Sequence, residues 1–411
     1  MTRSLQNVAA LIVAITILQL AGGLIGVRLP VDVAAEGMSR AALGFVSACY
    51  SAGFMLGAAL ATALLAHVGP IRVYAACAAT FSAATLLLHF ADHVWVWCLL
   101  RLLAGVAVAL LFASVESWMS WSIDSSQRGE VLGVYQVSTK LGLSLGPFLV
   151  ATYAPLSAEP WILAGAIAAI SLVPICFTST QQPDPPKAEP LALGPLFATA
   201  PAAVISSFGS GFLNTGILTL APVYAIEHWG PGAAAGFFAA AWVGSLLLQW
   251  PAGRLSDRID RRIVIGMLAS FSGAAALLIT IFDTGLNQWQ ATTLFFCWGA
   301  GALSFYGVGV AHMADRADRG DLANSAAGLL FIWAAGAVAG PIAIGVADQV
   351  FGGRGLFGAG ALGACLVAAA MFWRRTARKA PAPEQKEEFA PYPASSVAAA
   401  EIAYGQDEER N

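Results

Sequence analysis

The sequence predicts an all-α membrane protein in which twelve transmembrane helices form two six-helix halves. Three observations support this fold class: an apolar composition, twelve long apolar runs and an internal repeat. Of the 411 residues, 58% are hydrophobic and only 11% are charged, whereas soluble proteins average about 25% charged residues. Most of the chain is therefore expected to face lipid or a buried core. The net charge of −3 provides no basic surface for nucleic acid.

The apolar runs are bounded by charged residues or proline and have the length of about 20 residues that a helix needs to cross a bilayer. In the first half they cover residues 8–28, 43–66, 72–91, 94–121, 129–152 and 160–178. In the second half they cover residues 196–226, 233–253, 263–283, 288–313, 322–347 and 355–373. Because the runs are continuous rather than alternating, they favour helices over the strands of a barrel.

The loop charges orient these helices. With an even number of spans, both termini share one side, which carries fourteen Lys and Arg residues against three on the other side, Arg28, Arg40 and Arg354. Cytoplasmic loops are enriched in Lys and Arg. We therefore expect both termini in the cytoplasm and a multi-pass protein of a bacterial inner (plasma) membrane.

The chain divides into four parts. Residues 1–178 form the N-terminal six-helix half and residues 196–373 the C-terminal six-helix half. Between them, residues 179–195 are polar and contain five prolines, which is typical of a cytoplasmic linker. Residues 374–411 begin with a basic stop, and the tail from residue 380 is expected to be disordered because it has too little apolar surface to fold.

The two halves repeat one another. Residues 124–130 match residues 315–321 at an offset of 191, and Gly53 corresponds to Gly244. A glycine-proline pattern recurs at an offset of 194, as Gly142, Gly146 and Pro147 and again as Gly336, Gly340 and Pro341. Glycines four residues apart allow two helices to pack closely. Repeated halves are typical of secondary transporters.

The loop between the eighth and ninth spans carries the most specific motif. Residues 253–262 read Gly-Arg-Leu-Ser-Asp-Arg-Ile-Asp-Arg-Arg, which resembles the pattern G-x-x-x-D-R-x-G-R-R of the major facilitator superfamily. Asp260 departs from this pattern, since glycine is usual there. The resemblance implies a cytoplasmic gate in which the arginines pair with Asp315 and Asp321 near the start of span eleven. The alternative is a positively charged membrane anchor alone.

The residues expected in this gate come from three loops at the same end of the bundle. They are Gly253, Asp257, Arg258, Arg261, Arg262, Asp124, Arg128, Asp315, Arg319 and Asp321.

Three charged residues lie inside apolar spans, where charge is unfavourable and usually functional. Arg101, followed by Gly105, resembles the family's span-four arginine motif, which is tied to proton coupling; a structural ion pair is the alternative. Glu116 is either a protonation site or a partner for Lys140 or Arg128. Lys140 either faces a substrate cavity or does not, and the sequence leaves these two interpretations equally open.

The family resemblance also implies a cavity lined mainly by spans one, four, seven and ten. Gln19, Asn214 and Tyr306, together with Lys140, are the candidate substrate-cavity residues, although each also suits an ordinary hydrogen bond between helices. Glu116-Ser117-Trp118, the run 249–262 and the run 311–315 are similar to the poorly characterised YcaD-type bacterial subgroup. Lys140 departs from that subgroup, in which an aromatic residue is usual.

We therefore expect a secondary active transporter that moves a small organic solute, anionic or amphipathic, by proton-coupled alternating access. A lipid or lysolipid flippase, or a non-transporting membrane sensor, are the alternatives. The sequence contains no phosphate-binding loop, metal-spaced cluster or nucleophile–base motif, so we expect no enzyme activity, cofactor or metal. The expected partners are the lipid bilayer, the substrate and protons, and the chain is expected to be a monomer.

Overall fold

The computed structural model describes residues 3–123, 127–178, 193–317, 322–377, 386–390 and 395–396. All regular elements in these residues are α-helices or short 3₁₀ turns. The N-terminal half contains α1 (Arg3–Ala35), α2 (Arg40–Val68), α3 (Pro70–Leu87), η1 (Leu88–Phe90), α4 (Val94–Ser122), α5 (Arg128–Leu145), η3 (Gly146–Leu149), α6 (Glu159–Ile170) and α7 (Leu172–Cys176). The C-terminal half contains α8 (Leu193–Thr199), α9 (Pro201–Trp229), α10 (Ala233–Arg258), α11 (Arg261–Phe282), η4 (Asp283–Gly285), α12 (Gln288–Ala302), α13 (Phe305–Ala314), α14 (Leu322–Phe351) and α15 (Gly353–Ala377).

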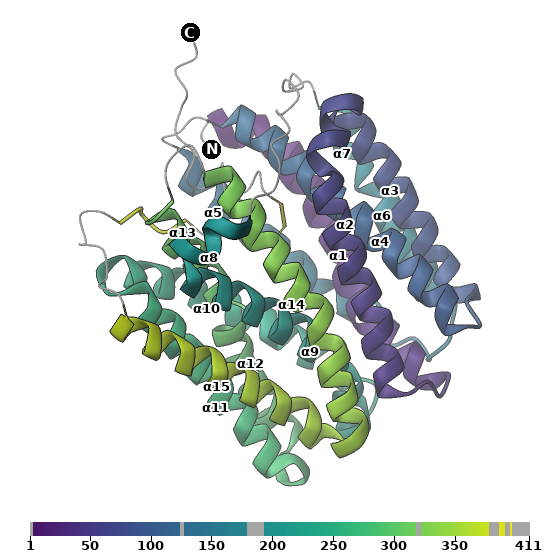
Figure 1. Ribbon diagram of the computed structural model, residues 1–411. Coiled ribbons are helices and arrows are strands. Elements are labelled where there is room, and N and C mark those ends of the chain that lie inside the picture. Colours follow the sequence, from purple (N-terminus) through teal and green to yellow (C-terminus); the bar gives the residue numbers. More distant parts are fainter. Residues whose placement is uncertain are drawn as a thin grey trace.

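The long helices form a bundle of two groups. Figure 1 shows the helices of the N-terminal half, in purple and blue, gathered apart from those of the C-terminal half, in teal to yellow. The two groups meet where α2 packs on α14 and α5 packs on α10. We call the end of the bundle where α1 begins and α15 ends the inner end, and the opposite end the outer end.

Within the described residues, eleven segments are long and apolar enough to cross a membrane, which confirms the all-helical membrane fold. The twelfth expected span, the fifth along the chain, corresponds to α5 and η3. Its 18-residue helix carries Arg128, Glu130 and Lys140, so its composition alone does not identify it as a span. Nevertheless α5 packs along both α1 and α10 inside the bundle.

Three other spans are interrupted where the sequence indicates continuous helices, and one of them, residues 160–178, divides into α6 and α7 at Ser171. Residues 196–226 divide into α8 and α9, with the second helix beginning at Pro201; proline is favoured at the first position of a helix because it lacks the N–H that would go unpaired there. Residues 288–313 divide into α12 and α13, with Leu303 and Ser304 between them. Broken helices within a membrane protein are tolerated where they are buried or line a cavity.

The glycine motifs place the helices of both halves in the same way. A Cβ on Gly146 of η3, directly after α5, would lie 2.2 Å from the carbonyl oxygen of Leu20 in α1, and one on Gly340 of α14 would lie 2.1 Å from that of Phe212 in α9. Glycine is required at such a close approach. The companion residues Gly142 and Gly336 meet α1 and α9 in the same manner.

The second glycine pair behaves similarly. Gly53 of α2 faces the carbonyl oxygen of Leu102 in α4, and Gly244 of α10 faces that of Phe296 in α12, at 2.0 and 2.2 Å from an added Cβ. Gly53 and Gly244, which correspond in the sequence repeat, thus have the same packing role in the two halves.

The outer end of the bundle is held closed between the halves. Arg40 at the start of α2 forms ion pairs with Glu227 of α9 and, at 3.6 Å, with Asp348 of α14. Its backbone N–H donates to Gln349 Oε1 at 2.8 Å. One turn further in, a Cβ on Gly44 would lie 2.1 Å from the carbonyl oxygen of Pro341, so the backbones of α2 and α14 touch there.

Candidate functional site

A cavity of about 360 Å³ lies between the two halves. Its walls come from α1, α2, α4 and α5 on one side and from α9, α10, α13 and α14 on the other. Much of the lining is aromatic, and it includes Tyr50, Phe112, Tyr135, Phe238, Trp242 and Trp333. The cavity therefore presents apolar and aromatic faces together with a small number of polar groups, as sites for small organic ligands do.

The four polar residues predicted for the cavity and Arg101 of span four all reach it. Gln19, Arg101, Lys140, Asn214 and Tyr306 line this one space, although they come from five different helices. The structure thus brings together residues that are almost 300 positions apart in the chain.

Lys140 links the two halves across the cavity. Its side chain is 7% exposed, and its Nζ donates hydrogen bonds to Ser245 Oγ at 2.7 Å and to Gln249 Oε1, both on α10. Ser245 in turn donates to the carbonyl oxygen of Leu303 at 3.3 Å, at the break between α12 and α13. These partners of Lys140 are neutral, so the described residues place no carboxylate against its ammonium group.

Arg101 is a second cation in the same cavity, and it is half-buried. Its guanidinium carbon lies 4.1 Å from the centre of the Tyr50 ring, a cation–π contact. Its Nε is buried and has no hydrogen-bond partner among the described residues. The structural ion pair considered as an alternative for Arg101 is not formed within these residues.

Two further polar atoms at the cavity are buried without a hydrogen-bond partner in the described part of the chain, Asn214 Oδ1 and Trp242 Nε1. The amide nitrogen of Asn214 is occupied, since it donates to Ser210 Oγ at 3.0 Å. A buried polar group without a partner is unfavourable by about 1–3 kcal/mol. A ligand that supplies one acceptor to Trp242 and one donor to Asn214 would remove that penalty.

Glu116 lies beyond the cavity toward the inner end and is completely buried. Its carboxylate accepts hydrogen bonds from the Tyr135 hydroxyl at 2.5 Å and from the hydroxyls of Ser395 and Ser396. Tyr135 also lines the cavity and so connects the carboxylate to that space. The hydrogen bonds of Lys140 go to α10 instead of Glu116, and the side chain of Arg128 lies outside the described residues.

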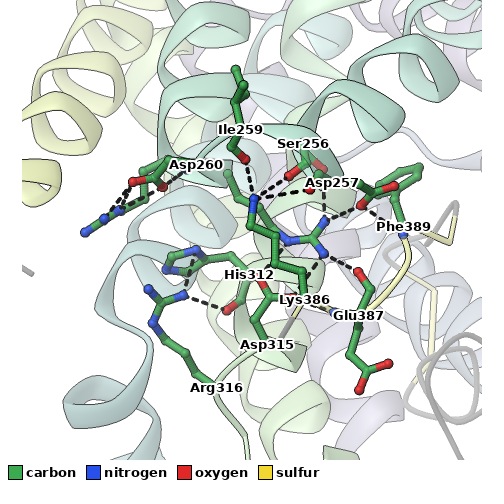
Figure 2. A network of polar contacts seen from close by, with 12 residues as sticks. Ser256, Asp257, Ile259, Asp260, His312, Asp315, Arg316, Lys386, Glu387 and Phe389 are labelled. Carbon is green, nitrogen blue, oxygen red and sulfur yellow. Dashed lines mark hydrogen bonds and ion pairs between the residues drawn. The ribbon is translucent and has the colours of Figure 1, made fainter. Parts of the chain in front are cut away.

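A charged cluster occupies the inner end of the C-terminal half (Figure 2). Arg261 is 1% exposed and holds Asp315 through two bonds, Nε to Oδ2 at 2.7 Å and Nη2 to Oδ1 at 3.0 Å. Arg261 also donates to Asp257 Oδ1 at 3.1 Å and to Ser256 Oγ at 2.9 Å. The contact between Arg261 and Asp315 was among those that the motif predicts.

Asp260 and Arg262 form the second part of this cluster. Asp260 caps α11 by accepting from the backbone N–H of Arg262, and its carboxylate also holds the Arg262 guanidinium at 2.7 Å. Although burial alone raises the pKa of Asp260, the hydrogen bonds and charge of Arg262 outweigh burial and hold that pKa below its usual value. Asp260 thus caps α11 and pairs with Arg262, and the glycine usual at this position has no side chain to do either.

Several predicted gate residues have no described contacts. Asp124, Arg319 and Asp321 lie outside the described residues, as does the side chain of Arg128. Arg258 is exposed on the last turn of α10. Arg262, expected to reach across to Asp315 or Asp321, binds Asp260 of its own loop, and within the described residues Asp315 pairs with Arg261 and not with Arg262.

Comparison with known proteins decides the family. The model of the Major Facilitator Superfamily matches residues 11–332 and, in a second match, residues 203–404. The chain belongs to the major facilitator superfamily. It is therefore a multi-pass membrane protein of a family of transporters.

The relative and the solved structures that this chain resembles match it over most of its length and over most of their own. The uncharacterized MFS-type transporter YcaD of Escherichia coli O9:H4 (strain HS) is 28% identical over 360 residues, which cover 86% of this chain and 91% of that protein. The nucleoside transporter NupG has the same fold with a TM-score of 0.72 at 13% identity, over 89% of this chain and 98% of that one. The human organic anion transporter MFSD10 (TETRAN) has a TM-score of 0.63 at 17% identity, over 90% and 100%.

One set of contacts in this major facilitator protein was not predicted from its sequence. Residues 386–390 and 395–396, in a tail expected to be disordered, pack against the inner end. Lys386, Glu387 and Phe389 contact the charged cluster, and Ser395 and Ser396 contact Glu116. The only local signal is Phe389, a large aromatic residue in a polar, acidic stretch.

Proposed function

We propose that this protein is a secondary active transporter that moves a small organic anion with an apolar or aromatic body by alternating access, coupled to protons. One observation carries the proposal. Two cations, the half-buried Arg101 and the buried Lys140, line a cavity between two repeated halves, and the described residues offer neither of them a carboxylate partner. Arginine stays protonated in essentially every protein environment. An anionic solute supplies the missing counter-charge.

The rest of the lining defines the solute further. The aromatic walls suit a flat or bulky apolar body, and a volume of about 360 Å³ suits a molecule of small-metabolite or drug size. The fold neighbours named above include a nucleoside transporter and an organic anion transporter. Their names support a small organic solute as the class and leave this chain's own solute to experiment.

Glu116 is the proposed proton site. It is a buried carboxyl group that is connected to the cavity by Tyr135, and intramembrane carboxyl groups commonly serve as proton relays in transporters. Protonation of Glu116 would change the hydrogen-bond partner of Tyr135, which touches the cavity directly. A solute and a proton can thereby influence one another although Glu116 itself is not in the cavity wall.

Alternation between two states is supported by the two ends of the bundle. Contacts of Arg40 and Gly44 join the halves at the outer end, whereas the Arg261 cluster at the inner end lies within the C-terminal half. In the proposed cycle the outer contacts break as the inner ends of the halves approach each other. The inner end faces the cytoplasm in this proposal, on the strength of the loop charges.

The proposal is tested first by binding. Purified protein is screened for thermal stabilisation by organic anions, neutral analogues of the same shape and organic cations, because a ligand that binds only the folded state raises the melting temperature. Anions are expected to stabilise the wild type, and Lys140→Met is expected to weaken that effect. Thr293→Val, at an exposed position whose hydroxyl bonds only its own helix backbone at 2.8 Å, is the control.

Flux of the stabilising anion into proteoliposomes is then measured with and without a pH step. Accumulation that follows the pH gradient supports the proposal. Stabilisation by cations alone, or binding without flux in either direction, contradicts it.

A further inference from the structure

The inner end of the protein is crossed by a segment of its own C-terminal tail. Phe389 N donates to Asp257 Oδ1 at 3.1 Å in the C-terminal half, and six residues later Ser395 Oγ donates to Glu116 in the N-terminal half. Ser395 also lines the central cavity. The tail therefore reaches from the charged cluster of one half into the space between the two halves.

The C-terminal half presents a site that fits this segment closely. Lys386 Nζ donates to the carbonyl oxygens of Ser256 (3.2 Å) and Ile259 (2.6 Å), at the end of α10, where unpaired carbonyls and the helix dipole favour a cation. The backbone of Glu387 is held from both sides, because its N–H donates to Asp315 Oδ1 at 3.1 Å and its carbonyl oxygen accepts from Arg261. Figure 2 shows these tail residues among the side chains of the cluster.

Phe389 fills an apolar recess beside these polar contacts. Its side chain is 8% exposed and belongs to the apolar cluster that includes Ala252 and Val264. A Cβ on Gly253 would lie 2.0 Å from Phe389 Cδ1, so the ring docks only because residue 253 is glycine. The motif suggests that Gly253 lies close to another helix. Among the described residues, its close neighbour is the tail.

The N-terminal half completes the site with a single acceptor. Both Ser395 and Ser396 donate hydroxyl hydrogens to the Glu116 carboxylate, one to each oxygen. Together with Tyr135 they surround a carboxylate that is 0% exposed. The tail accordingly occupies the approach from the inner end to Glu116 and to the cavity.

We propose that the inner end is a binding site for the protein's own C-terminal tail, through residues 386–390 and 395–396, and that these docked residues cover the cavity from the inner side until they are released. The ligand class is a peptide with a cation, an aromatic ring three residues on and a pair of hydroxyls. The site needs both halves in their present spacing, so closing the inner end requires the segment to leave. In the proposed transport cycle, a docked tail therefore holds the protein in the state with the outer end closed.

The test measures access to the cavity and needs no known substrate. Gln136, which lines the cavity and is 6% exposed, is replaced by Cys in a protein whose native cysteines are replaced. The rate of its alkylation by a bulky maleimide is measured on purified protein in detergent. Removal of residues 380–411, or Phe389→Ala, is expected to raise that rate on the order of 5-fold or more, the lower end of typical coupling between sites.

Glu388→Ala is the matched control, because Glu388 is exposed and adjacent to Phe389 in the same segment. It is expected to leave the rate unchanged. A synthetic peptide of residues 380–411, added to the truncated protein, is expected to slow alkylation again, and Phe389→Ala in the peptide is expected to abolish this effect. Equal rates in the full-length and truncated proteins overturn the proposal. So does a peptide that protects equally well with and without Phe389.

Discussion

Asp260 illustrates how a single departure from a family pattern is compensated locally. The carboxylate caps α11 and pairs with Arg262. Loss of an N-cap side chain reduces stability by about 1 kcal/mol. We predict that Asp260→Ala lowers the melting temperature in detergent at pH 7, while Asp260→Asn, which keeps an oxygen for the cap and loses the charge, has a smaller effect.

The pH dependence follows from the lowered pKa of Asp260. A carboxyl group whose folded-state pKa is depressed stabilises the fold above its usual pKa of 3.8 and loses that contribution as pH falls through the lowered value. Melting curves of the wild type and Asp260→Ala should therefore differ at neutral pH, and the part of the difference that the charge contributes should vanish only as pH falls below that lowered pKa. Equal melting temperatures at pH 7 would show that the cap carries no stability.

A second prediction at this scale concerns Glu116. Glu116→Gln is expected to leave exchange of solute across proteoliposomes intact while abolishing accumulation driven by a pH gradient, because the amide cannot take up the proton. Ser114→Ala is the control, since Ser114 is buried in the same helix and bonds only to the backbone of Leu110. Accumulation by Glu116→Gln that still follows the pH gradient assigns Glu116 a structural role.

At the scale of the elements, the glycine-lined contact between α5 and α1 makes a sharp prediction. Gly146→Ala places a methyl group 2.2 Å from the Leu20 carbonyl, and overpacking of this kind destabilises by about 1–3 kcal/mol. Gly133 of α5 has open space around it. Gly133→Ala should therefore be neutral or stabilising, because alanine is more favourable in a helix than glycine by about 1 kcal/mol. Thermal unfolding in detergent compares the two, and equal melting temperatures contradict the close approach.

The elements were predictable to different degrees for physical reasons. Long apolar runs bounded by charge identify most spans, because only helices of that length satisfy the backbone in lipid. The breaks at Ala200 and at Leu303 were not visible, since a short interruption leaves the apolar run intact. The fifth span was predicted as an apolar run over residues 129–152, and the loop charges supported the number of spans, although the three charged residues of α5 make its own composition ambiguous.

For the whole molecule, the loop charges predict an orientation that can be measured. Reporters fused after Pro183 and after Lys379 are expected to be cytoplasmic, and one inserted between Asp32 and Ser39 external. A cytoplasmic signal from the loop between Asp32 and Ser39 contradicts the twelve-span arrangement, because a missed span reverses every later loop.

The closed outer end predicts an effect of cross-linking on transport. With native cysteines replaced, Arg40→Cys and Glu227→Cys joined by a short bifunctional thiol reagent should stop flux through proteoliposomes, and a reductant that cleaves the reagent should restore it. Arg40→Cys alone, treated in the same way, is the control. Continued flux through the cross-linked protein means that the halves need not separate there.

The candidate site was predictable in its members and less so in its connections. Polar residues in apolar spans are few, and the family resemblance implies cavity walls from spans one, four, seven and ten; together these identified Gln19, Arg101, Lys140, Asn214 and Tyr306. The pairing of Lys140 with Ser245 and Gln249 was not, because it depends on how two halves of the chain face each other. The docked tail was missed because composition does not show that the backbone of Glu387 and Phe389 and the side chains of Lys386, Ser395 and Ser396 meet acceptors and donors at the inner end.

The strength of the ion pairs of Arg40 depends on the salt concentration of the medium at the outer end. Glu227 is 55% exposed and Arg40 is 21% exposed, so mobile ions screen their attraction over a Debye length of about 8 Å at physiological salt. Raising the ionic strength at the outer surface weakens this attraction, while the backbone contact between Gly44 and Pro341 is indifferent to it. In the proposed transport cycle, ambient salinity would thereby set part of the balance between the two orientations of the cavity.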